Sequence, residues 1–257
     1  RCPRSRRAAG ERSTTKNYSA FGRATVWPPR RAALLTSTME DDSVAPIPNP
    51  VVQQQVFLLL HTGSNEQVRK SALEKLWRNI EQDEMAPYYE FLLADANVAQ
   101  YVPRREEILR ALREKNSQEI ARLDSEQKRA EENEGDIELH TVLKQRAMYL
   151  ARIGDKEAAL PAIDEAFAKA TGTGSKIDFM LLKIRLGLFY GDPELTEKSM
   201  ASAAALIEEG GDWDRRNRLT AYRGVYAASI RDFGESSKRC TEALSTFTAV
   251  SYTHLTL

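Results

Sequence analysis

Residues 207–219 read IEEGGDWDRRNRL and contain the end of one helix, a break and the start of another. Gly210 and Gly211 can adopt the left-handed backbone conformation in which many helices end. Asp212 then stands where a side chain caps the next helix, and Asp214 places negative charge in its first turn, where it is favourable. The segment therefore predicts two helices joined by a tight turn, the second with arginines at three early positions: Arg215, Arg216 and Arg218.

A related turn occurs three times in the second half of the chain: IGDK at 153–156, YGDP at 190–193 and IRDF at 230–233. The aspartates of these turns, each placed to cap the second helix of a pair, are Asp155, Asp192 and Asp232. They are 37 and 40 residues apart, close to the period of about 34 residues of one class of helix–turn–helix repeat. Residues 136–248 are therefore predicted to form a right-handed solenoid of TPR-like repeats.

The residues before the repeats also favour helices, because no stretch alternates between apolar and polar positions as a half-buried strand would. Short apolar-periodic segments over 51–103 predict short helices. Residues 104–134 are strong helix formers with a thin apolar stripe, which predicts one long charged helix lying against the repeats. A coiled-coil seam is the alternative, but it requires three or four clean heptads that the segment lacks. The predicted fold class is all-α.

The two ends differ from this body in composition. Residues 1–38 contain nine Lys or Arg and one acid, whereas the rest of the chain has a net charge of −8. Scattered Pro and Gly argue against the amphipathic helix of a mitochondrial transit peptide, and a basic nucleic-acid-binding arm would interleave aromatic residues. We favour a third interpretation, disordered translated upstream sequence before a natural start at Met39. Residues 39–50 are predicted to be a proline-rich linker, and 249–257 a non-native tail.

Residues with potential chemistry are isolated from one another. No second metal ligand lies three or four residues from any of the histidines, which are His61, His140 and His254. Gly172 and Gly174 follow no strand, as a phosphate-binding loop would, and Cys240 has no nearby His to activate it. No apolar run reaches the roughly 18 residues of a membrane span. We therefore predict no enzyme activity, no cofactor or metal, and no nucleic acid, membrane or small-molecule substrate as partner.

Four further segments accompany residues 207–219, in this order along the chain: MAPYYEFL at 85–92, ARLD at 121–124, YLARIGDKEAA at 149–159 and RLGLFY at 185–190. Together they closely resemble the non-ATPase subunit 6 family of the proteasome regulatory-particle lid. The resemblance extends over about residues 45–248. Members of this family are helical-repeat proteins that end in a winged-helix (PCI) module, which docks them to sister subunits. The chain stops before that module is expected to begin.

The resemblance implies a non-catalytic scaffold subunit that supports ATP-dependent degradation of ubiquitinated proteins. Its implied partners are the other lid and base subunits, and its implied location is cytoplasmic and nuclear. Two alternatives stay open. Subunit 1 of the COP9 signalosome shares the architecture but serves cullin deneddylation. A free-standing TPR-like peptide-binding adaptor is the other, although its basic residues would be spread over successive repeats.

The arginine-rich turn has two interpretations. In the first, Arg215, Arg216 and Arg218 form a solvated helix face and pair with local acids, while Trp213 packs against Leu219 or the preceding repeat. In the second, Trp213 and the three arginines anchor a neighbouring subunit, because Trp and Arg are enriched at interface hot spots. The sequence leaves both open.

Overall fold

The computed structural model describes residues 47–61, 63, 65–133 and 135–253. Every described residue belongs to one compact unit. The predictions for residues 1–38 and for most of the 39–50 linker lie outside the described residues. The last helix continues to Thr253, into the segment predicted to be a non-native tail.

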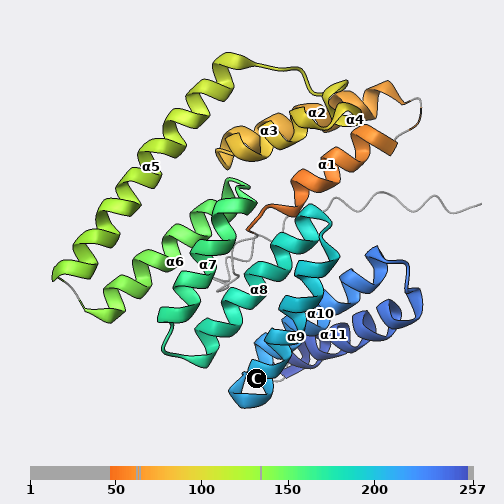
Figure 1. Ribbon diagram of the computed structural model, residues 1–257. Helices are drawn as coiled ribbons and strands as arrows, with labels where there is room; N and C mark the ends of the chain where they lie inside the picture. The colour runs from red at the N-terminus through yellow and green to blue at the C-terminus, as the bar shows by residue number, and fades with distance from the viewer. Residues whose placement is uncertain (1–46, 62, 64, 134, 254–257) are drawn as a thin grey trace, which may run out of the picture. The chain divides into compact units, whose positions relative to one another are not determined.

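The described residues form eleven helices and no strand, which confirms the all-α fold class. Five helices come first: α1 (Pro50–His61), α2 (Glu66–Gln82), α3 (Ala86–Ala94), α4 (Ala96–Ala99) and the long α5 (Glu106–Asn133). Three helix pairs follow: α6 (Asp136–Arg152) with α7 (Lys156–Lys169), α8 (Thr173–Tyr190) with α9 (Pro193–Gly210), and α10 (Trp213–Ser229) with α11 (Phe233–Thr253). Each pair packs on the next, through α7 on α8 and α9 on α10, an order compatible with a solenoid (Figure 1).

The helices before α5 pack around one hydrophobic cluster. Tyr88 and Tyr89 of α3 are fully buried in it. The Trp77 ring of α2 meets Tyr89 edge-on, with ring centroids 5.0 Å apart. The Tyr89 hydroxyl donates to the Pro103 carbonyl at 2.8 Å and accepts from the Arg105 N–H at 2.8 Å. These two hydrogen bonds join α3 to the segment that begins α5.

The long helix α5 contributes to two hydrophobic clusters. Leu109 and Leu112 pack with the N-terminal helices, whereas Leu123 and Ala130 pack with the repeats. The thin apolar stripe is therefore buried within the chain, against α3 and α6. The outer face of α5 has ion pairs at helical spacing, as a solvated face does: Arg122 with Glu119 and with Glu126.

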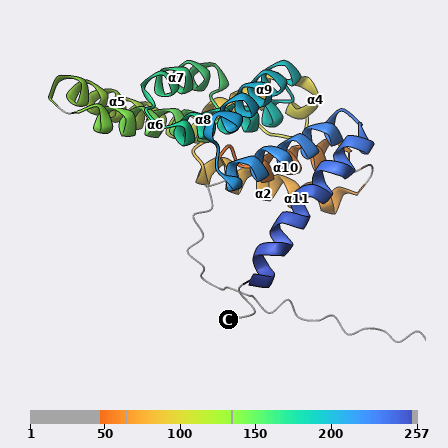
Figure 2. The ribbon, with the colours of Figure 1, turned by 90° about the horizontal axis from the view of Figure 1, so that it is seen from below.

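The repeats surround the second cluster, in which α8 has neighbours on several sides. Ile177 and Leu186 of α8, Ile163 of α7 and Ala203 of α9 are fully buried there. The last pair has fewer neighbours, because α11 packs mainly against α10. Figure 2 shows the final turns of α11 running past the end of α10. From Phe233 to Ser245, most side chains of α11 are accordingly exposed or half-buried.

The three repeat turns share one backbone geometry. Each has one residue in the left-handed region: Gly154, Gly191 and Arg231, with φ of 73°, 62° and 65°. The next residue donates its N–H to the carbonyl five residues earlier: Asp155 to Leu150, Asp192 to Gly187 and Asp232 to Ala227. This is the Schellman arrangement that satisfies the last carbonyls of a helix. In the third turn an arginine holds a conformation that costs a non-glycine residue about 1–2 kcal/mol.

The predicted left-handed backbone at Gly210 and Gly211 is wrong. Gly210 is the last residue of α9, and Gly211 has φ −75° and ψ 139°, a conformation open to most residues. Position 211 requires glycine for space instead. A Cβ there would lie 2.7 Å from Cα of Ile207 and 2.8 Å from its Cγ1. The double glycine thus marks a close approach of the chain to its own preceding helical turn.

Candidate subunit interface

The arginine-rich turn opens α10 at the surface. Asp212 caps the helix, because its Oδ1 accepts a hydrogen bond from the Arg215 N–H at 2.8 Å. Trp213 is the first residue of α10 and remains 52% exposed, whereas Leu219 is buried. Trp213 is therefore not buried against Leu219 or the preceding repeat. An exposed Trp next to arginines matches the composition of interface hot spots.

Arg215 joins two repeats inside the chain. Its Nε and Nη2 donate to the two carboxylate oxygens of Asp178 on α8 at 2.9 and 2.7 Å, and Nη1 donates to Asp212. The hydrogen bonds to Asp178 are the main cause that raises the pKa of the Arg215 guanidinium. The guanidinium also lies over Gly174, where a Cβ would be 3.1 Å from Cζ. Arg215 thus clamps α10 to α8, because its guanidinium donates to both carboxylate oxygens of Asp178 in a bidentate geometry.

Arg216 and Arg218 are placed differently. Arg216 donates to Glu208 at 3.3 Å, and both side chains are more than half exposed. Arg218 lies 2.7 Å from Asp214, one helical turn earlier. Ion pairs at a protein surface contribute about 0–1 kcal/mol, so a partner carboxylate can replace the local one at small cost. The structure therefore separates Arg215, which binds an acid 37 residues away on α8, from two arginines that pair with acids nearby in the sequence: Arg216, with a side chain 54% exposed, and Arg218, with one 30% exposed.

The three repeat-turn aspartates cap helices by the same hydrogen bond. Their Oδ1 atoms accept from N–H groups three residues later, at 2.9 to 3.1 Å: Asp155 from Ala158, Asp192 from Leu195 and Asp232 from Glu235. Asp192 has a further partner, because Lys156 Nζ donates to its Oδ2 at 2.7 Å. The Leu195 N–H and Lys156 together lower the pKa of Asp192. No local sequence pattern indicated this pair, because its two members are 36 residues apart in successive repeats.

An aromatic cluster joins the N-terminal helices to the repeats and was also missed. The Tyr88 ring of α3 lies with its centroid 4.8 Å from Phe189 and 6.0 Å from Tyr190, both on α8. Gln53 of α1 donates to the Tyr88 hydroxyl at 3.0 Å and to the Phe189 carbonyl at 2.5 Å. Burial raises the pKa of Tyr88. The paired aromatics in MAPYYEFL and RLGLFY are the sequence signal that could have indicated this junction.

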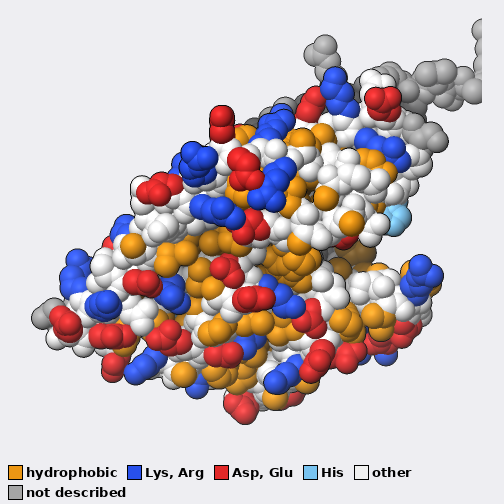
Figure 3. Space-filling model, turned by 45° about the horizontal axis from the view of Figure 1, so that its top comes forward, with side chains coloured by type: hydrophobic (Ala, Val, Ile, Leu, Met, Phe, Trp, Pro, Cys, Tyr) orange, Lys and Arg blue, Asp and Glu red, His pale blue; other side chains and the backbone are white. Residues whose placement is uncertain are grey.

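The described surface offers little other chemistry. Among the described residues, no three His, Cys, Asp or Glu side chains gather closely enough to hold a metal ion. The helices of the described ranges include none that is both long enough and apolar enough to span a membrane. On the face shown in Figure 3, acidic and basic side chains are interspersed, with apolar side chains gathered between them. The arginine-rich turn remains the main candidate for partner binding.

The sequence from α5 onward matches a known protein family. The family model, described as 26S proteasome subunit RPN7, matches residues 105–256. The chain belongs to the RPN7 family. The matched range includes all three helix pairs, so the RPN7 match contains the repeat turns and the arginine-rich turn.

Curated RPN7 relatives come from distant organisms. The 26S proteasome regulatory subunit RPN7 of Saccharomyces cerevisiae is 33% identical over 230 residues, which cover 83% of this chain and 54% of the relative. The 26S proteasome non-ATPase regulatory subunit 6 of Caenorhabditis elegans is 36% identical over 200 residues, with coverage of 78% and 48%. The Arabidopsis thaliana homolog of subunit 6 is 33% identical over 201 residues, with coverage of 78% and 51%. The chain spans about half the length of the curated relatives it matches.

Proposed function

We propose that this chain is the helical-repeat part of a non-catalytic scaffold subunit of the proteasome regulatory-particle lid. In this role it holds neighbouring lid and base subunits, and so supports ATP-dependent degradation of ubiquitinated proteins. The supporting observation is the RPN7 family match, which includes every repeat and the long helix. Helix hairpins packed in series suit such a role, because they present an extended surface to partners.

The proposed contact surface is Trp213 with Arg216 and Arg218. Trp213 is exposed at the start of α10, and both arginines pair only with acids on the same surface. Arg215 is excluded from this surface because its guanidinium holds Asp178. The surface therefore offers an aromatic ring and two cations to an acidic or apolar patch on a neighbouring subunit.

The test places the chain in a full-length RPN7-family subunit and measures incorporation into the lid by affinity purification. Substituting Trp213 by Ala together with Arg216 and Arg218 by Ser should leave helix content and melting temperature nearly unchanged. Incorporation should weaken by about 30-fold or more if these residues act as hot spots. Normal incorporation of the variant would refute this contact surface. Failure of the unsubstituted subunit to enter the lid would refute the scaffold role itself.

The same purification separates the two alternatives from the lid. Recovery with deneddylation subunits would support subunit 1 of the COP9 signalosome, and recovery alone with short peptides would support a free-standing adaptor. The RPN7 match favours the lid over both. We further propose a cytoplasmic and nuclear location, which fluorescence microscopy of the tagged full-length protein would test.

A further inference from the structure

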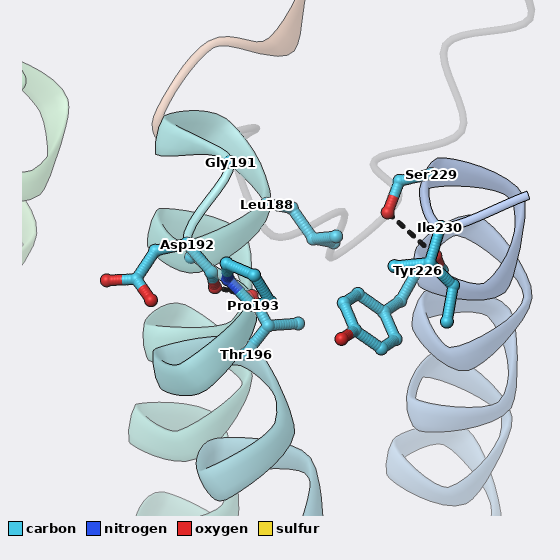
Figure 4. Close-up of a pocket in the computed structure, with 9 residues that line it drawn as sticks. Leu188, Gly191, Asp192, Pro193, Thr196, Tyr226, Ser229 and Ile230 are labelled. Carbon is cyan, nitrogen blue, oxygen red and sulfur yellow. Dashed lines mark hydrogen bonds between the residues drawn. The ribbon is translucent and has the colours of Figure 1, made fainter.

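A pocket of about 210 Å³ lies between the α8–α9 turn and the end of α10. Leu188, Pro193 and Thr196 line one side, and Tyr226 and Ile230 line the other. Figure 4 shows Leu188 and Tyr226 pointing toward each other across the pocket, while the Asp192 carboxylate points away. The Tyr226 hydroxyl donates to Glu197 at 2.5 Å, which holds its ring as a wall. The pocket is thus mainly apolar and has a fixed aromatic side.

The junction between the first and second helix pairs shows which side chain fills the corresponding space. There the end of α8 meets the α6–α7 turn, and the Tyr190 hydroxyl donates to the Gly154 carbonyl at 2.5 Å. Lys156, which follows the cap of that turn, lies with its Nζ 5.6 Å from the Tyr190 ring centroid. A Cβ on Gly154 would be 3.2 Å from the Tyr190 hydroxyl. A tyrosine therefore covers the first turn.

The second junction lacks this tyrosine. Two residues before the cap aspartate, Tyr190 is replaced by Ile230, which is 54% exposed. A Cβ built on Gly191 would meet nothing within 4 Å. No described residue donates a hydrogen bond to the Gly191 carbonyl, the counterpart of the Gly154 carbonyl. The second turn thus has the same backbone conformation as the first, but its Gly191 carbonyl has no donor among the described residues and no ring covers it.

We propose that this pocket binds a tyrosine side chain of another polypeptide, with the ring between Leu188 and Tyr226 and the hydroxyl donating to the Gly191 carbonyl. The volume suits one ring, because an apolar cavity of about 150 Å³ binds benzene. It is smaller than the roughly 300–1,000 Å³ of small-molecule sites, which favours a single side chain over a free ligand. Phe233, 68% exposed in the next turn, offers apolar surface to the rest of such a partner.

The first test titrates the methyl-labelled chain with p-cresol, a tyrosine side chain without its backbone, and with toluene, which lacks the hydroxyl. NMR shifts should be confined to the methyl groups of Leu188, Thr196 and Ile230. The p-cresol affinity should exceed that of toluene by about three- to tenfold, as expected for one neutral hydrogen bond. Equal affinities, or shifts spread over the surface, would overturn the proposal. So would failure of N-acetyl-L-tyrosine amide to bind where p-cresol binds.

The second test supplies the ring from within the chain. Ile230→Tyr should fill the pocket, raise the melting temperature and weaken p-cresol binding by about tenfold or more, because intramolecular occupancy acts at high effective concentration. Ile230→Phe is the matched control and should raise the melting temperature less. Unchanged p-cresol affinity in Ile230→Tyr would overturn the proposal. The titration of the unsubstituted chain decides the question even if a variant fails to fold, and neither test depends on lid assembly.

Discussion

The first and third repeat turns have the same backbone conformation in different surroundings. Gly154 has φ 73° and lies against Tyr88 and Tyr190, whereas Arg231 has φ 65° and is exposed. The first turn requires glycine for backbone freedom and for space, and the third has only the backbone requirement. One repeat signature thus combines a local requirement, the left-handed backbone conformation, with a packing requirement, the space for a neighbouring side chain. Only the packing requirement depends on the neighbouring helices.

A substitution at position 154 should cost the most stability, because it violates the backbone requirement and the packing requirement together. Gly154→Ala would hold an alanine at positive φ and place its Cβ 2.6 Å from the Tyr88 Cβ. We expect a loss of about 2–5 kcal/mol in the free energy of unfolding, from backbone strain and overpacking together. Urea unfolding followed by circular dichroism measures it. Gly191→Ala is the control with backbone strain alone, expected at about 1–2 kcal/mol, and equal losses would contradict the distinction.

The second prediction compares two arginines at the start of α10, one that holds another helix and one that is exposed. Arg215→Ser should cost about 1–3 kcal/mol in unfolding free energy, because it leaves the half-buried Asp178 without its bidentate partner. Arg216→Ser, on the exposed side of the same turn, should change it by less than about 0.5 kcal/mol. Thermal and urea unfolding of both variants provide the comparison. Similar losses in unfolding free energy would mean that the contact of Arg215 with Asp178 does not stabilise the fold more than the surface pair of Arg216 does.

In the middle turn, the contribution of the helix cap to stability can be measured separately. Asp192→Ala should cost about 0.5–2 kcal/mol through the lost cap. Asp192→Asn keeps a capping oxygen but loses the charge that meets Lys156, and should cost less than about 1 kcal/mol. Because the folded-state pKa of Asp192 is lowered, its carboxylate stabilises the fold above the unfolded pKa of about 3.9 and less at lower pH. The gap in unfolding free energy between the unsubstituted chain and Asp192→Asn should therefore narrow as pH falls below about 4. A gap independent of pH would contradict this.

At the third turn, a substitution at position 231 should change stability only slightly. Arg231→Gly should stabilise the chain by about 0.5 kcal/mol, because relief of positive-φ strain slightly exceeds the conformational freedom that glycine adds to the unfolded chain. At this size the melting temperature would rise by about 1–2 °C. Arg231→Lys keeps the strain and should leave the melting temperature unchanged. A fall in stability for Arg231→Gly would show that the arginine side chain has a packing role.

Features set within one turn were predictable from the sequence. An N-cap aspartate and the N–H that it binds are three residues apart, so Asp155, Asp192 and Asp232 could be proposed as caps without knowledge of the fold. The all-α class followed from apolar periodicity over long segments. The double glycine was misinterpreted, because glycine permits many conformations and the sequence does not show that Ile207 lies close to position 211.

Features set between repeats were not predictable from local patterns. Arg215 and Asp178 are 37 residues apart, and Lys156 and Asp192 are 36 apart. Each pair depends on how one helix hairpin packs on the next, and short-range patterns do not contain that register. Arg215 therefore looked equivalent to Arg216 and Arg218 in the sequence, because only packing distinguishes it from them. Whether Trp213, Arg216 and Arg218 contact another subunit stays a prediction.

The position of α5 in both hydrophobic clusters has a consequence for unfolding. At about 1.5 Å per residue its 28 residues extend about 42 Å, with Leu109 and Leu112 in one core and Leu123 and Ala130 in the other. Opening either core removes part of the support of the same helix. Phe189 couples them again, because it lies on a repeat helix but packs in the N-terminal cluster. The N-terminal helices and the repeats should therefore unfold in one cooperative transition, and the slowest amide hydrogen exchange in α5 should report the global free energy.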